Sequence, residues 1–171
     1  INHFPEKMLK EKQGMGLEKL KKDYEALREK YNLPTFRELN EDFYIEEVAE
    51  SETDILLRKV RIKIGEGLTN FMKFIEILLN PVNAPMFIFS IVKLITPEDR
   101  KELSEIYKEL VKKEVNIIEL DLGFDEKKEA EFIKESYTSW QKIKKDLMQI
   151  ITKINKKWDN KSEANTKGYF G

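Results

Sequence analysis

The chain has 171 residues, no cysteine, one histidine and a formal net charge of −1. These counts exclude disulfides, thiolate metal sites and cysteine nucleophiles, and the lone His3 does not support a Ser-His-Asp triad or a multi-histidine metal site. A nearly neutral chain also lacks the basic excess that is typical of general nucleic-acid binders. The hydrophobic fraction of 40% is that of a folded protein rather than a disordered one.

The spacing of apolar residues predicts an all-α protein, an antiparallel bundle of about five to six helices. We expect three parts: an irregular N-terminal segment over residues 1–16, a single helical domain over residues 17–158 and a frayed polar tail over residues 159–171. Lys and Glu dominate the charged residues, a bias that thermophile proteins and AT-rich genomes share.

The first two helices have clear sequence limits. Apolar residues at steps of three and four predict a helix from Leu17 to Tyr31, which stops before Pro34 because proline disfavours helix at the residue that precedes it. Thr35-x-x-Glu38 is a capping box, so a short second helix is expected to begin there.

Two long helices, about residues 44–80 and 125–158, are expected to surround a buried helix over about residues 85–95. The segment of residues 85–95 is apolar on nearly every side, which is typical of a helix buried all round. A further helix is predicted from Pro97 to about residue 121. Gly65 and Gly67 lie inside the first long helix, where they indicate either a kink or the close approach of another helix.

Five short motifs follow one another in a recognisable order. They are residues 31–40 (YNLPTFRELN), 79–81 (LNP), 84–87 (APMF), 97–100 (PEDR) and 129–134 (EAEFIK), the last followed by Trp140. The order resembles that of a family of small uncharacterised all-helical proteins found in archaea and bacteria. The resemblance covers about residues 17–158. It implies an all-helical fold and an archaeal setting, and it implies no activity and no catalytic residue.

The most unusual local feature is an acidic segment without any Lys or Arg from Glu38 to Asp54. Glu46, Glu47 and Glu50 have helical spacing and Asp54 follows one turn later, so these carboxylates are candidate ligands for Mg²⁺ in a metal-dependent hydrolase. The pattern resembles the first metal motif of the helical nucleoside triphosphate pyrophosphohydrolases, but their second Glu-x-x-Asp motif is missing at the required spacing. A solvated acidic helix start, favoured by the helix dipole, is the preferred interpretation.

The C-terminal region is basic, and Lys153, Lys156 and Lys157 are its candidate contacts for nucleic acid. The same lysines avoid the apolar stripe of their helix, as a solvated face does, so this interpretation is favoured over nucleic-acid binding. The apolar run of residues 68–95 is interrupted by charged residues and prolines. We therefore expect a buried hairpin and no membrane span.

The last long helix carries apolar residues at near-heptad steps, which predicts a surface for association. Its candidate interface residues are Trp140, Leu147, Ile151, Ile154 and Trp158. The favoured hypothesis is therefore a cytoplasmic helical protein that acts by association, as a homo-oligomer or with a protein partner. No catalytic constellation is evident in the sequence, and no cofactor is expected.

Overall fold

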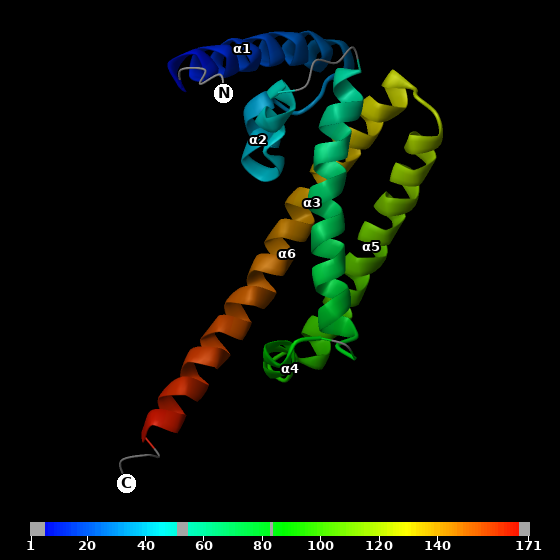
Figure 1. Ribbon diagram of the computed structural model, residues 1–171. Coiled ribbons are helices and arrows are strands. Elements are labelled where there is room, and N and C mark those ends of the chain that lie inside the picture. The colour runs from blue at the N-terminus through cyan, green and yellow to red at the C-terminus, as the bar shows by residue number, and fades with distance from the viewer. Residues whose placement is uncertain (1–5, 51–54, 83, 168–171) are drawn as a thin grey trace. The chain divides into compact units, whose positions relative to one another are not determined.

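The computed structural model describes residues 6–50, 55–82 and 84–167, with side chains for residues 16–49, 55–82 and 84–160 (Figure 1). In these residues it has six α-helices, one 3-10 helix and no strand, which confirms the all-α prediction. The elements are α1 (Glu6–Tyr31), α2 (Phe36–Phe43), η1 (Ile45–Glu50), α3 (Leu56–Leu79), α4 (Met86–Val92), α5 (Pro97–Leu122) and α6 (Glu126–Lys167).

The chain packs as two compact units, and α3, α5 and α6 contribute residues to both. Unit 1 comprises residues 1–67 and 115–138, and unit 2 comprises residues 68–114 and 139–171. Each unit is described by itself, and the expectation of a single helical domain over residues 17–158 stays a prediction.

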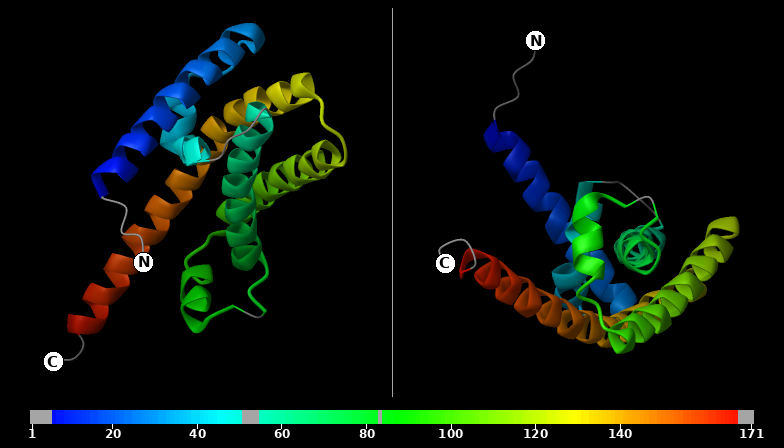
Figure 2. Two further views of the ribbon diagram at one scale, coloured as in Figure 1. Left: turned by 45° about the horizontal axis from the view of Figure 1, so that its top comes forward. Right: turned by 90° about the horizontal axis from the view of Figure 1, so that it is seen from below.

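In unit 1, α1 contacts α2 and η1, and α2 lies beside α1 in both Figure 1 and Figure 2. The capping box of α2 is present as predicted, because Thr35 and Glu38 exchange hydrogen bonds. Tyr24 is fully buried and donates its hydroxyl proton to the Pro34 carbonyl oxygen at 2.7 Å. Burial raises the pKa of Tyr24, so this hydroxyl stays a donor at all physiological pH values.

The unit 1 segments of α3 and α5 run antiparallel, because Arg58 meets Leu120 whereas Gly65 meets Ile117. A Cβ atom at Gly65 would lie 3.0 Å from Ile117 Cδ1, and one at Gly67 would lie 3.0 Å from Phe43 Cδ1. The helix α3 is continuous through both positions. Of the two predicted explanations for these glycines, the structure therefore supports close approach.

In unit 2, the same two helices remain antiparallel. Thr69 donates to Glu114 at 2.7 Å, and Arg100 donates to the carbonyl oxygen of Leu79 at 3.1 Å. The end of α3 therefore lies beside the start of α5, as expected in an antiparallel bundle. From α6, the ring of Trp140 packs on Phe71 with a centroid distance of 4.7 Å.

The buried face of α6 follows a heptad pattern with alternating steps of four and three. Its members are Glu129, Ile133, Ser136, Trp140, Ile143, Leu147, Ile150 and Ile154. Two of them are polar, which is unusual for such inward positions. The sequence prediction found only part of this row, since it placed the stripe along Ile151 and Trp158 instead of Ile150.

Both predicted chain ends differ from the structure. The prediction of an irregular segment over residues 1–16 is wrong from Glu6 onwards, because residues 6–16 belong to α1. Strong helix formers such as Lys, Glu, Met and Leu fill that stretch and outweigh its two glycines. The expected frayed tail is likewise helical up to Lys167, since the sequence has neither Pro nor Gly between Gly123 and Gly168.

The predicted long helix over residues 44–80 is wrong in its first third. Tyr44 ends α2 in the left-handed conformation with φ of 54°, and the 3-10 helix η1 follows. Ile45 and Val48 are both buried, and their spacing of three residues matches the period of a 3-10 helix. The following α-helix begins only at Leu56.

The expectation of a helix buried all round over residues 85–95 is also wrong. The helix α4 has only seven residues, and among them only Ile88 is buried. Met86 and Phe87 are 82% and 60% exposed. An apolar helix is buried all round only where neighbouring elements cover every one of its faces, and the described residues cover only one face of α4.

Candidate functional site

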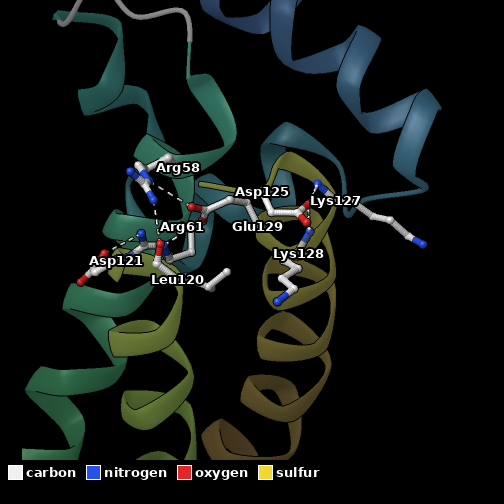
Figure 3. A network of polar contacts seen from close by, with 8 residues as sticks. All are labelled: Arg58, Arg61, Leu120, Asp121, Asp125, Lys127, Lys128 and Glu129. Atoms are coloured by element: carbon white, nitrogen blue, oxygen red, sulfur yellow. Dashed lines mark hydrogen bonds and ion pairs between the residues drawn. The ribbon is translucent and has the colours of Figure 1, made fainter. Parts of the chain in front are cut away.

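A network of charged side chains lies in unit 1, where α3, α5 and the start of α6 meet (Figure 3). Arg61 donates to Glu129 Oε2 at 2.8 Å and to Asp121 Oδ1 at 2.7 Å. Arg58 donates to the other oxygen of Glu129 at 3.1 Å and to the Leu120 carbonyl oxygen at 2.6 Å. The side chains of Arg61 and Glu129 are 1% and 0% exposed.

Charges this deeply buried persist only when paired and hydrogen-bonded. Burial by itself lowers the pKa of Arg61, but its hydrogen bonds to Glu129 and Asp121 outweigh that effect and raise the pKa. Both oxygens of Glu129 accept from arginines, so the carboxylate is neutralised by its own chain. This arrangement fixes three helices to one another and favours a structural role over a catalytic one.

The start of α6 adds a polar cluster beside this network (Figure 3). Asp125 caps the helix, as its Oδ1 atom accepts from the backbone N–H groups of Lys127 and Lys128. Glu126 accepts from Lys30 at 2.9 Å and from Tyr31 at 2.6 Å, which joins the end of α1 to α6. These hydrogen bonds lower the pKa of Glu126.

Of the four carboxylates predicted to hold a metal ion, the structure describes the side chains of two, so the site stays a prediction. Glu46 accepts from Asn40 at 3.0 Å and Glu47 pairs with Lys63 at 2.6 Å, so both described members have partners within the chain. They lie on a 3-10 helix, so the assumed α-helical spacing of Glu46, Glu47 and Glu50 is wrong. Asp54 and the side chain of Glu50 lie outside the described residues. In the described part of the chain, no three potential ligands stand together.

The predicted nucleic-acid contacts lie in unit 2, and two of the three are engaged there. Lys153 pairs with the buried carboxylate of Asp99 at 2.7 Å, and Lys157 donates to the Leu94 carbonyl oxygen at 2.8 Å. Lys156 is exposed. An open groove of about 450 Å³ runs along this helix, lined by Lys145, Met148, Gln149, Thr152 and Lys153.

The predicted interface on α6 divides into two groups. Trp140, Leu147 and Ile154 are buried by their own chain, so they belong to the core and are not available to a partner in this conformation. Ile151 is half-buried and Trp158 is 47% exposed. For these two residues the interface stays a prediction.

The sequence analysis missed a row of exposed apolar side chains on α5. Val111, Val115, Ile118 and Leu122 are 36%, 60%, 55% and 85% exposed. Their steps of four, three and four place them on one face of the helix. The signal was present in the sequence, because the four apolar residues recur at helical spacing.

A second exposed apolar surface, the α4 tip, consists of Val82, Met86, Phe87 and Phe89. These four large side chains occur within eight residues of unit 2, and the last is 36% exposed. Pro85 stands at the N-cap position of α4 without a side-chain cap.

Comparison with known proteins adds no assignment to this geometry. No family model matches the chain, and neither a curated protein nor a solved structure is significantly similar to it. The resemblance to a family of archaeal and bacterial helical proteins therefore stays a prediction. In the described helices, no stretch combines the length and the apolarity that crossing a membrane requires.

Proposed function

We propose that this protein acts by association with other protein chains, either with a second copy of itself or with a partner protein. The observation that carries the proposal is the exposure of large apolar side chains in two places, the row on α5 and the α4 tip. Scattered apolar residues are normal on protein surfaces, whereas grouped ones mark sites of interaction.

The pairing of the polar side chains also supports a role in association. Glu129, Arg61 and Asp99 are buried and paired with groups of their own chain, and Glu47 and Lys153 have partners as well. Buried ion pairs of this kind hold a fold together, while an enzyme needs polar groups that converge on a substrate. The proposal therefore rests on two apolar surfaces that are exposed in the part of the chain that the structure describes.

The first experiment measures the mass of the full chain by light scattering over a wide range of concentration, followed by chemical cross-linking in a lysate of its host. We expect either a mass that rises toward two chains or a cross-linked partner whose contacts map to α5 or α4. The double substitution Met86→Ser with Phe87→Ser removes apolar surface from the α4 tip. Because both side chains are exposed, it should leave the melting temperature unchanged.

A matched control is Glu131→Gln, which alters an exposed residue whose ion pair with Lys127 is long, at 4.0 Å. It should change neither mass nor cross-links. A constant mass of one chain together with no cross-linked partner contradicts the proposed function.

A further inference from the structure

We propose that α5 pairs with α5 of a second copy of this chain in antiparallel orientation, along the α5 row of Val111, Val115, Ile118 and Leu122. The inference rests on the proposed function and names the partner of one of its two surfaces. It is carried by the spacing, the volumes and the flanking charges of α5.

The helix α5 has two apolar rows, and the residues that the structure describes bury only one of them. The inward row is buried and consists of Leu103, Ile106, Leu110 and Leu120. The α5 row lies apart from it and repeats with the alternating steps of four and three that two-stranded coiled coils use. An unpartnered helix face with this repeat has the geometry to receive another helix.

The order of side chains along the row favours the antiparallel orientation. An antiparallel pair centred between Val115 and Ile118 places Val115 against the second copy's Ile118, and Val111 against its Leu122. Every layer then holds one smaller and one larger side chain. A parallel pair would instead place identical residues together, which gives two small valine layers at one end of the row and larger isoleucine and leucine layers at the other, and this packs less evenly.

The charges beside the row make the same distinction. With the row at heptad positions a and d, Lys112 and Glu119 occupy the e positions, and both are exposed. An antiparallel pair brings Lys112 of each copy next to Glu119 of the other, which gives two attractive contacts. A parallel pair would bring Glu114 of one copy next to Glu119 of the other, and these like charges repel.

The positions on the other side of the row oppose pairing less than their charges indicate. An antiparallel pair places Glu114 beside the second copy's Asp121. Asp121 forms an ion pair with Arg61 of its own chain at 2.7 Å, which offsets its charge, whereas Glu114 keeps its charge in both orientations. Glu119 contacts Lys128 of its own chain at a longer distance, 3.4 Å, and both of these side chains are exposed. The attractive pairs of Lys112 with Glu119 therefore decide the orientation.

The size of the row predicts a weak dimer. Four partly exposed aliphatic side chains offer a few hundred Å² of apolar surface, whereas stable dimers bury roughly 800 Å² on each partner. We expect a dissociation constant on the order of micromolar, and hence a mass that depends on concentration.

The test is sedimentation equilibrium of the full chain and four variants, with circular dichroism melts to show that each remains folded. Ile118→Glu should abolish dimer formation and leave the melting temperature unchanged, since Ile118 is half exposed. Lys112→Glu and Glu119→Lys should each weaken the dimer roughly tenfold, because each turns two attractive contacts into repulsive ones. Combining the two substitutions should restore the original affinity.

Other outcomes overturn the inference in separable ways. If Glu119→Lys strengthens the dimer while Lys112→Glu leaves it unchanged, the pairing is parallel and the proposed orientation is wrong. A dimer that persists in Ile118→Glu does not use the α5 row, although association through the α4 tip would remain. A chain that stays monomeric at every concentration contradicts self-pairing. The proposed function is contradicted as well only if, in addition, no partner protein is cross-linked to the chain in the lysate.

Discussion

Replacing Glu129 by leucine removes the acceptor that two arginines share in unit 1. Arg61 is 1% exposed and would keep a single partner, Asp121, which is itself largely exposed. Removing one partner of a buried ion pair typically costs about 3–5 kcal/mol, because the remaining charge stays buried without compensation. The side chain of Arg58 is 22% exposed and can turn to water, so most of the cost arises at Arg61. We therefore expect Glu129→Leu to destabilise the protein by about 3–5 kcal/mol.

The assay is urea unfolding followed by circular dichroism, with Glu131→Gln as the control on the same helix. The control should cost less than about 0.5 kcal/mol, because its ion pair is exposed. The double variant Arg61→Met with Glu129→Leu should be more stable than Glu129→Leu alone, since it removes the uncompensated charge as well. A loss in Glu129→Leu no larger than in the control would refute the reasoning, and so would a double variant less stable than the single one.

Three further predictions concern stability and use the same unfolding assay. Gly65→Ala should be neutral or stabilise the protein by up to about 1 kcal/mol, because the new methyl group meets the flexible end of an isoleucine that can move. Gly67→Ala should destabilise the protein by about 1–2 kcal/mol, because a buried phenylalanine ring stands at the same distance. Equal effects of the two substitutions would contradict this prediction. Ser136→Ala should stabilise by about 1 kcal/mol, since the buried hydroxyl has no hydrogen-bond partner in the described part of the chain, and a loss would show that it has one. Burial by itself raises the pKa of Asp99, but its hydrogen bonds from Lys153 and Thr96 outweigh that effect and lower the pKa; its contribution to stability is therefore present above about pH 4 and lost as the pH falls through the lowered pKa. Asp99→Asn should accordingly be less stable than the parent at pH 7, and the difference should shrink in acid.

Helix limits were predictable wherever local chemistry sets them. The capping box of Thr35 and Glu38, the proline at the start of α5 and the Asp125 cap of α6 each act within one turn, so the sequence contains the whole cause. The break at Tyr44 was not predictable in this way. Its left-handed conformation allows Ile45 and Val48 to become buried on a 3-10 helix, and that gain depends on contacts distant in sequence.

The candidate surfaces were harder to predict because burial depends on which neighbours are present. The segment of α4 has the composition of a core helix, yet only Ile88 is buried. On α6 the predicted interface included Trp140, which its own chain covers. Glu129 stands at an inward heptad position of that helix, and its role depends on arginines 68 and 71 residues away along the chain. Periodicity indicates the faces of a helix, whereas only packing distinguishes a core face from an exposed one.

The central claim, association through exposed apolar surface, is tested most directly by sedimentation equilibrium of the unmodified full chain from well below to well above micromolar concentration. The account predicts a mass that rises from one chain toward two, and Ile118→Glu is predicted to stay at one chain throughout. A mass of one chain at every concentration, together with no cross-linked partner in a lysate of its host, would contradict it.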